Sequence, residues 1–359
     1  MFNFFRNKKI EAFGMDISNV SIKVMQLARD GDSLIPQAYA DVQIPSNIIV
    51  NHMITNEEKL ADQIKRAISA AGKITSKYVV ASVPEAKSFV RILKLPKLSE
   101  QEIEGAIPWE LEQDIPVPVD QVYLDWQIIS DAADKLEVLV VATPKDYVDI
   151  LISSLKLAGL KPTALELESQ ATARALISSA DANSAILILD IASLLTSFII
   201  IDQGVLQYTS SIPIGGNALT ESIARNLGLR PADAEKMKRE LGLLADAKQG
   251  NIRAAMLPIL DNIIDEIKNV ARFHEEHSTA KKPISRVILA GGGSRLLGIV
   301  DYISARLNLG AARPIGRVTL GDPWINVLGH TDEEHAPLSR EQALGFATVT
   351  GLALRGMGK

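Results

Sequence analysis

The stretch FGMDISNVSIK, residues 13 to 23, interrupts an apolar run with an aspartate, followed by small polar residues and a lysine. A second stretch with the same pattern, LDIASLLTSFII, spans residues 189 to 200. Each is typical of two buried strands joined by a short polar turn, because β-branched and apolar residues flank the polar segment. Each stretch opens one half of the chain, so the sequence predicts two halves related by a weak internal repeat.

The composition is that of a folded protein with more than one core. The chain has 359 residues, of which 47% are hydrophobic and 23% charged, with a net charge of -5. This length favours two domains, and the negative charge argues against a nucleic-acid partner. The absence of cysteine excludes disulfides, thiolate zinc sites and cysteine nucleophiles, and it is typical of a reducing compartment.

One apolar stretch, residues 184 to 201, is long enough to be considered as a membrane span. Asp190 lies near its middle, isoleucine is abundant, and the stretch leads into the turn sequence IDQG. We therefore predict two buried strands joined as a hairpin there, and no membrane helix.

Hydrophobic periodicity and capping residues predict the order of the remaining elements. A helix is predicted to begin at Thr55 or Asn56 and to stop at Gly72, and Ser99 with Glu102 has capping-box spacing. Residues 85 to 160 read as a β-α-β-β-α unit. Three strands open the second half, and they are followed by a helical stretch from 218 to 277, a strand ending in a glycine turn, and two further helices.

Several known sites are excluded by spacing. Gly72 and Lys73 lack the remaining residues of a phosphate-binding Walker loop, and the glycines at 291 to 293 do not fit a dinucleotide fingerprint. His274 and His277 lack both metalloprotease spacing and a third ligand nearby in the sequence. Gly-x-Ser-x-Gly does not occur, so a nucleophile elbow is not predicted.

The two aspartate hairpins offer another way to bind a nucleotide. Asp16 precedes Ser18, Asn19 and Ser21, and Asp190 precedes a similar pair, Ser193 and Thr196. Each turn could wrap phosphates, while the two aspartates hold Mg²⁺ through water, since this ion keeps most of its waters and needs few carboxylates. The alternative is that each aspartate only caps a turn.

Two further motifs fit a nucleotide site. The sequence VILAGGGSRLLG places Gly291, Gly292 and Gly293 between a strand and a helix, which would let a flat ring or a phosphate approach the backbone. Glu235 and Lys238 are three residues apart, so they share one helical face and could grip ribose hydroxyls. A tight turn and a surface ion pair are the respective alternatives.

In this order along the chain, the motifs resemble the actin-like ATPase superfamily, and more closely its PilM family of type IV pilus assembly proteins. The phrases that carry this resemblance include GMDISNVSIKVMQL, LPKLSEQEIEGAIPWELEQDIPVPVDQVYLDWQI, LELESQATARAL, ADAEKMK and AGGGSRLLGI. The resemblance implies an α/β, two-lobed actin-like (ribonuclease H-like) ATPase fold with an inserted α+β subdomain. It places the first lobe at 1–84, with 160–180 and 339–359 returning to it, the partner-binding insert at 85–159, and the second lobe at 181–338 with a helical subdomain at about 217–283.

The same resemblance implies a role for each site residue. Asp16 and Asp190 would hold Mg²⁺ through water, and Glu168 would position the attacking water. The predicted ATP contacts are Asp16, Ser18, Asn19, Ser21, Lys23, Asp190, Ser193, Thr196, Gly215, Gly216, Glu235, Lys238, Gly291, Gly292, Gly293 and Ser294.

The implied function is that of a cytoplasmic ATP-binding scaffold for the type IV pilus, and hence for twitching motility, or for related type II secretion-like machinery. Its implied partners are the cytoplasmic N-terminal peptide of a PilN-type inner-membrane protein, through which it would sit at that membrane, other pilus assembly proteins and further copies of itself. A filament-forming cell-division protein like FtsA and a small-molecule kinase of the same superfamily remain alternatives.

Two residues depart from the family pattern. Relatives usually have glycine where this chain has Ser18 and Ala192. A Cβ in each turn would narrow the approach of the phosphates, and a left-handed backbone there would cost roughly 1 kcal/mol or more. We therefore expect slow ATP hydrolysis at most, and a binding switch or scaffold in preference to a fast enzyme.

Overall fold

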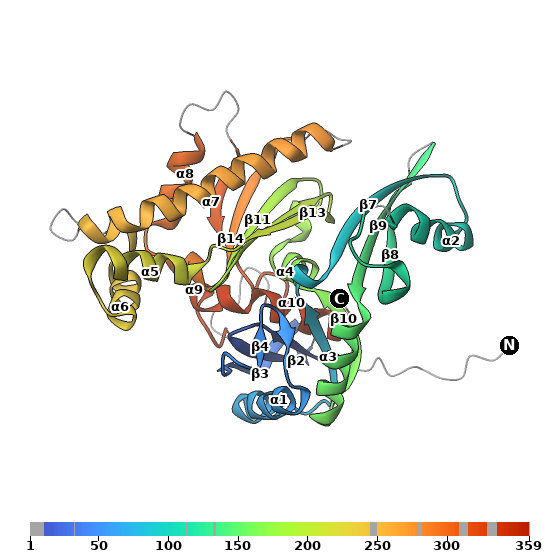
Figure 1. The fold of residues 1–359 in the computed structure, drawn as a ribbon, viewed down its shortest axis with the longest axis horizontal. Helices are drawn as coiled ribbons and strands as arrows, with labels where there is room; N and C mark the ends of the chain where they lie inside the picture. Colours follow the sequence, from blue (N-terminus) through green and yellow to red (C-terminus); the bar gives the residue numbers. More distant parts are fainter. Residues whose placement is uncertain are drawn as a thin grey trace. The chain divides into compact units, whose positions relative to one another are not determined.

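The computed structural model describes residues 11–31, 33–112, 114–131, 134–244, 250–278, 282–308, 315–328 and 336–358 (Figure 1). The chain divides into two compact units. The first comprises residues up to Ala175 together with 327–337 and 348–359, and the second comprises 176–326 and 338–347. Within the described ranges, no helix has the length and apolar character needed to cross a membrane.

A five-stranded sheet in the order β10-β6-β1-β2-β3 forms the centre of the first unit. Strands β1, β2 and β3 are antiparallel neighbours, whereas β6 runs parallel to both β1 and β10. Asp16 lies near the end of β1, directly opposite Lys23 of β2. The strand bounds are β1 Phe13–Ile17, β2 Ser21–Asp30, β3 Ser33–Gln43, β6 Tyr78–Val83 and β10 Lys161–Leu167.

Helices pack on this sheet and bury its apolar residues. The helices α1 (Glu57–Ala71) and α3 (Lys145–Leu157) contribute Leu60, Ile64, Leu151 and other side chains to one core with β1, β2 and β6. The side chain of Asn56 caps α1, and Gly72 ends it with a positive φ of 81°, as the sequence predicts. The helices α4 (Glu168–Leu176) and α10 (Ala347–Gly356) join a smaller cluster with β6.

A separate small core lies in the segment between β6 and β10. Its three-stranded antiparallel sheet has the order β7-β9-β8, and α2 packs on that sheet through a cluster of Leu, Ile and Val side chains. The predicted capping box of Ser99 and Glu102 begins α2. Helix α3 follows β9, but its buried face belongs to the main core of the first unit. The bounds are β7 Phe89–Pro96, α2 Glu100–Leu111, β8 Val122–Asp131 and β9 Lys135–Pro144. A short hairpin, β4 (Ile49–Val50) and β5 (Met53–Ile54), precedes α1.

The second unit repeats the strand arrangement of the first. Its sheet has the order β13-β12-β11-β14-β15, with three antiparallel strands followed by two parallel ones. The predicted hairpin within 184–201 is confirmed, because β11 and β12 pair directly. The internal repeat suggested by the two aspartate motifs therefore extends to the whole sheet. The bounds are β11 Ala185–Ile191, β12 Thr196–Asp202, β13 Val205–Ile212, β14 Arg286–Ala290 and β15 Arg317–Leu320.

The helical part of the second unit follows β13, also as predicted. A long helix, α7 (Gly250–His277), buries Met256, Leu260 and Ile264 against the sheet core. The shorter helices α5 (Gly216–Leu227) and α6 (Pro231–Leu241) precede it, and α8 (Ile299–Asn308) and α9 (Arg340–Ala343) follow. Figure 1 shows α5, α6 and α7 grouped at one side of this unit's sheet.

Candidate functional site

In the first unit, Asp16 is a buried carboxylate with two polar neighbours. Ser82 Oγ donates to Asp16 Oδ1 at 2.9 Å, and Lys23 Nζ lies 3.9 Å from Asp16 Oδ2. The same Ser82 hydroxyl accepts from the amide of Ile17 at 3.1 Å. Strand pairing therefore directs Lys23 toward Asp16, and β6 supplies a hydroxyl that fixes the orientation of the carboxylate.

Ser18 organises the turn between β1 and β2. Its Oγ accepts from the amides of Ser21 at 3.1 Å and Val20 at 3.4 Å, and donates to the carbonyl of Ser21 at 3.0 Å. The Asn19 side chain is also engaged, because its Oδ1 accepts from the amide of His52 at 3.2 Å. The Ser18 hydroxyl thus occupies two backbone amides of the turn. A phosphate oxygen could otherwise bind to these amides.

The left-handed strain expected at Ser18 and Ala192 is absent. Asn51, His52 and Gln203 are the non-glycine residues with positive φ in the described part of the chain. Serine and alanine fit these turns because each backbone keeps a negative φ. The prediction of left-handed backbone strain at these two positions is therefore wrong. These turns differ from turns with glycine only in carrying side chains.

Glu168 is the first residue of α4 and lies in a group of acidic side chains that the sequence analysis did not assemble. Glu85 Oε1 accepts from the amide of Ser169 at 2.9 Å, and burial is the largest influence raising the pKa of Glu85. Burial also raises the pKa of Tyr147, and the charges of Glu168 and Asp16 raise it further. Tyr147 is therefore near both predicted site carboxylates of this unit.

The second hairpin is tied to the start of α5. The amides of Gly216 and Asn217 donate to the carbonyls of Ala192 and Ser193 at 2.8 and 2.9 Å. A Cβ on Gly215 would lie 2.6 Å from Ala192 O, so the close approach requires glycine. Thr196 is fully buried, and its hydroxyl donates to Ile214 O at 2.6 Å. That hydroxyl therefore stabilises the hairpin from within, and the predicted contact of Thr196 with a phosphate stays a prediction.

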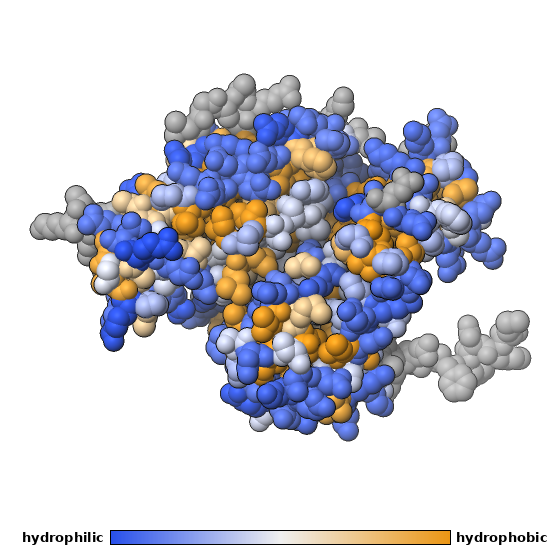
Figure 2. Space-filling model, in the orientation of Figure 1, coloured by the Kyte–Doolittle hydropathy of each residue, from blue (hydrophilic) through white to orange (hydrophobic). Residues whose placement is uncertain are grey.

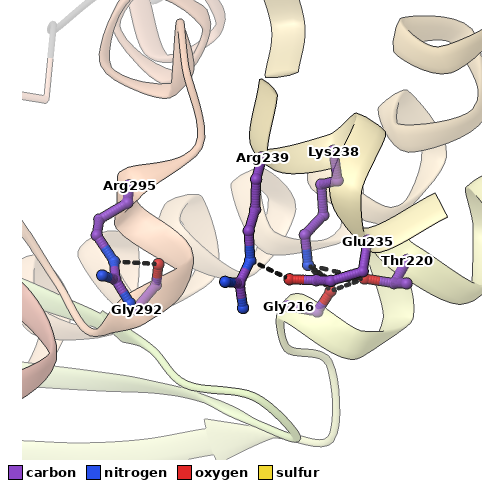
Figure 3. Close-up of polar contacts among 7 residues, drawn as sticks. All are labelled: Gly216, Thr220, Glu235, Lys238, Arg239, Gly292 and Arg295. Carbon is purple, nitrogen blue, oxygen red and sulfur yellow. Dashed lines mark hydrogen bonds and ion pairs between the residues drawn. The ribbon is translucent and has the colours of Figure 1, made fainter. Parts of the chain in front are cut away.

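Glu235 and Lys238 of α6 form a compact polar cluster with α5 (Figure 3). Lys238 Nζ lies 2.6 Å from Glu235 Oε2 and donates to Gly216 O and Thr220 Oγ1, each at 2.8 Å. Thr220 in turn donates to Glu235 at 2.5 Å. Arg239 Nε donates to the other carboxylate oxygen, Oε1, at 2.6 Å. Glu235 and Lys238 thus belong to a hydrogen-bonded cluster and are more than an isolated surface ion pair, and both carboxylate oxygens of Glu235 have partners.

The pKa values of this cluster follow from its burial and its charges. Burial raises the pKa of Glu235, but hydrogen bonds from Lys238, Thr220 and Arg239 outweigh it and hold the pKa below its usual value. Burial lowers the pKa of Lys238, and the nearby Arg239 charge lowers it further, although Glu235 opposes both.

The glycine turn after β14 divides into packed and open positions. A Cβ on Gly291 would overlap Asp190 and Ile191, and Gly291 has a φ of 78°. A Cβ on Gly293 would lie within 3.0 Å of Ile191. At Gly292 it would approach only Arg295, at 3.4 Å. The packed positions therefore bring the turn against the β11 strand that carries Asp190, and Gly292 remains the exposed one.

The next two residues of this turn, Ser294 and Arg295, differ in their exposure to solvent. Ser294 is buried and donates to Ala290 O at 2.5 Å, so its hydroxyl stabilises the turn. Arg295 is exposed, with its Nε 3.4 Å from Gly292 O. Figure 3 shows the guanidinium of Arg239 lying between this turn and the Glu235–Lys238 pair.

Sequence reasoning missed six residues of these sites: Ser82, Glu85, Tyr147, Thr220, Arg239 and Arg295. Arg239 was detectable, because it stands four residues after Glu235 on the same helical face. Arg295 directly follows the glycine motif. Glu85 and Thr220 come from elements far from their partners in sequence, so no local pattern indicated them.

The repeated sheet and its two aspartate hairpins place this protein in the class of actin-like ATPases. A solved structure of MreB5 of Spiroplasma citri bound to AMPPNP matches 96% of this chain and 95% of that one, with 12% identity and a TM-score of 0.53. A PilM–PilN type IV pilus biogenesis complex matches 97% of this chain and 99% of that one, with 25% identity and a TM-score of 0.80. The likeness confirms the predicted fold class.

Sequence comparison gives the family. The model of type IV pilus assembly protein PilM matches residues 14–357, so the chain belongs to the PilM family of type IV pilus assembly proteins. The cell division protein FtsA of Neisseria meningitidis serogroup B is 22% identical over 304 residues, which cover 72% of this chain and 73% of that protein.

Proposed function

We propose that this protein is an ATP-binding scaffold of type IV pilus assembly, in which nucleotide controls the binding of a partner peptide. The observation that carries the proposal is the partly buried, hydrogen-bonded cluster of Glu235, Lys238 and Thr220 beside the open glycine turn. An isolated exposed ion pair contributes little to stability, whereas this pair shares hydrogen bonds with Thr220 and Gly216. Perturbed ionisable groups are more often found at functional sites.

The nucleoside would bind to the second unit. Glu235 accepts hydrogen bonds and Lys238 donates them, which suits the two hydroxyls of a ribose. Gly292 lets a base approach the backbone because it carries no side chain. Arg239 and Arg295 present planar guanidinium groups, which stack on the π-face of a base.

The two hairpins would contact the phosphates. The proposed contacts are backbone amides of both turns and the side chains of Asn19 and Ser193, with Lys23 neutralising charge. Asp16 and Asp190 each offer the hard oxygen ligands that Mg²⁺ prefers, so the chemistry of each hairpin fits an ion bound through water. Bound Mg²⁺ would neutralise phosphate charge.

Replacing Ser18 by alanine tests the role of its hydroxyl in the first hairpin. The hydroxyl now satisfies the amide of Ser21, so its removal leaves that donor available to a phosphate oxygen. We expect ATP affinity to rise about 5-fold, corresponding to about 1 kcal/mol for one hydrogen bond. Calorimetric titration would measure this change. Unchanged or weaker binding in both Ser18→Ala and Ser18→Gly would show that the hydroxyl does not compete with nucleotide.

Hydrolysis would be slow. Glu168 is the proposed residue for positioning water, and its environment includes Glu85, a second carboxyl group. Burial holds the pKa of Glu85 above its usual value, so a second negative charge beside Glu168 is disfavoured. The proposal is therefore a switch that depends on nucleotide binding more than on turnover.

The proposed partner is the cytoplasmic N-terminal peptide of a PilN-type inner-membrane protein. The chain is similar to the PilM of a solved PilM–PilN complex over nearly its whole length, which supports this choice. An extended peptide could gain affinity from strand addition and apolar pockets. The protein would then be cytoplasmic and held at the inner membrane through this partner, alongside other pilus assembly proteins and further copies of itself.

Titration of a PilN-type peptide with and without ATP tests the proposed coupling. We expect peptide affinity to differ at least about 5-fold between the two states, because linkage energies of 1–3 kcal/mol are typical. Linkage also requires that the peptide change ATP affinity by the same factor. Equal peptide affinity in both states would contradict nucleotide control, whereas a peptide that does not bind at all would contradict the partner assignment.

A further inference from the structure

Helix α2 has one buried face and one unpartnered face. Ile103, Ile107 and Leu111 pack into the core of the three-stranded sheet. On the opposite side, helical spacing aligns Glu102, Gly105, Trp109 and Glu112, which are all exposed. We call these four residues the outer face of α2.

Trp109 is the most exposed large hydrophobic side chain in the described part of the chain. Its exposure is 76%, so it contributes almost nothing to the core of this unit. Tryptophan is depleted from ordinary surfaces and enriched at the centres of protein interfaces, where its large flat ring is buried by a partner. The fold therefore gives no reason for this side chain, and an interface does.

Gly105 is a second residue that the fold does not explain. It lies in the interior of α2, where glycine is less favourable than alanine. Its φ is not positive, and a Cβ built on it would meet nothing within 4 Å. No turn or packing contact therefore requires glycine. Because Gly105 has no side chain, the backbone of the helix is exposed one turn before Trp109. A partner can approach the helix closely at this strip.

The chain segment that contains this face carries only negative charge. No Lys, Arg or His occurs from residue 98 to residue 134, whereas ten acidic residues do: Glu100, Glu102, Glu104, Glu110, Glu112, Asp114, Asp120, Asp125, Asp131 and Asp134. The five on or next to α2, from Glu100 to Glu112, are all exposed. Figure 2 shows a mainly hydrophilic surface over α2. This local charge repels nucleic acid and anionic membranes and attracts a cationic segment.

We propose that the outer face of α2 docks a cationic amphipathic helix of another protein. An apolar side chain of that helix occupies the strip at Gly105 and packs against the Trp109 ring. Its Lys or Arg residues pair with Glu102 and Glu112, and one of them stacks on the ring as a cation–π contact. This surface goes beyond the proposed nucleotide switch and does not depend on it.

The test uses the full chain and three probes. The first probe is an 18-residue helical peptide of Leu and Lys with its apolar residues on one face. The second is the same peptide with Glu in place of Lys, and the third is phosphatidylserine vesicles. Calorimetry measures binding to the wild type and to Trp109→Ala, Gly105→Ala, Glu112→Gln and Leu157→Ala. Leu157 is exposed on α3, so it provides a matched control.

The expected result is binding of the Leu/Lys peptide alone. Trp109→Ala should weaken it at least 10-fold, and Gly105→Ala and Glu112→Gln at least 3-fold, while Leu157→Ala binds as the wild type does. Gly105→Ala should also raise the melting temperature, because alanine is the better helix former. A loss of binding in a more stable protein cannot be attributed to unfolding.

Four results would overturn the proposal. They are no binding of the Leu/Lys peptide by the wild type, wild-type affinity in both Trp109→Ala and Gly105→Ala, and binding to the vesicles. The fourth is self-association of the wild type that Trp109→Ala abolishes in sedimentation experiments, because the occupant would then be a second copy of this chain.

Discussion

Replacing Glu166 by glutamine is expected to lower the free energy of unfolding by about 3 kcal/mol. The Glu166 side chain is 1% exposed, and both its oxygens accept from Arg174 at 2.6 Å. Arg355 of α10 lies 3.1 Å from the same carboxylate. The change would remove the negative charge that Arg174 and Arg355 share. Removing one member of a buried ion pair destabilises a protein more than replacing the whole pair by apolar residues. Urea unfolding followed by circular dichroism measures the effect.

The matched control for this prediction is Glu11→Gln. Glu11 pairs with Arg29 in the same unit at 3.5 Å, but both side chains are about half exposed. Water and salt screen such a pair, so we expect a change below about 1 kcal/mol. Equal effects of the two variants would show that the Glu166 network does not join β10, α4 and α10 as its geometry indicates.

Replacing Lys238 by methionine is expected to weaken ATP binding about 30-fold, which corresponds to about 2 kcal/mol. The side chain is 12% exposed and connects Glu235 with Gly216 and Thr220. Methionine keeps the apolar length of the side chain but removes the charge and its hydrogen bonds. Glu235 would then lose the partner that fixes its carboxylate. The dissociation constant, measured with the folded variant, gives the result directly.

Lys236→Met is the control for that experiment. Lys236 lies on the same helix, is 72% exposed, and is 3.9 Å from Glu240. We expect ATP affinity within about 2-fold of the wild type, because an exposed pair at this distance contributes little. A similar loss in both variants would indicate a general effect of charge and not a specific site.

Local sequence signals predicted much of the fold. The Asn56 cap, the Gly72 stop and the Ser99–Glu102 capping box all appear as expected, because such signals act within a few residues. The two aspartate hairpins also indicated the duplicated sheet, since strand pairing within a hairpin is local. The apolar stretch at 184–201 forms the predicted hairpin of β11 and β12 and not a membrane-spanning helix.

The finer geometry of the site was not predictable in this way. Thr196 and Ser294 are both predicted ATP contacts, and the sequence does not reveal that their hydroxyls donate to main-chain carbonyls inside the fold. Glu85 reaches Ser169 across 84 residues, a separation that no periodicity can indicate. The prediction of backbone strain at Ser18 was wrong because residue type alone does not fix φ. The serine hydroxyl stabilises the turn instead.

The most direct test of nucleotide binding is a calorimetric titration of ATP into the wild-type chain, with and without Mg²⁺. We predict one saturable ATP site per chain, with tighter binding in the presence of Mg²⁺ and affinity about 30-fold weaker in Lys238→Met. The absence of saturable heat in the wild type, or ATP binding that Lys238→Met leaves unchanged, would contradict this prediction.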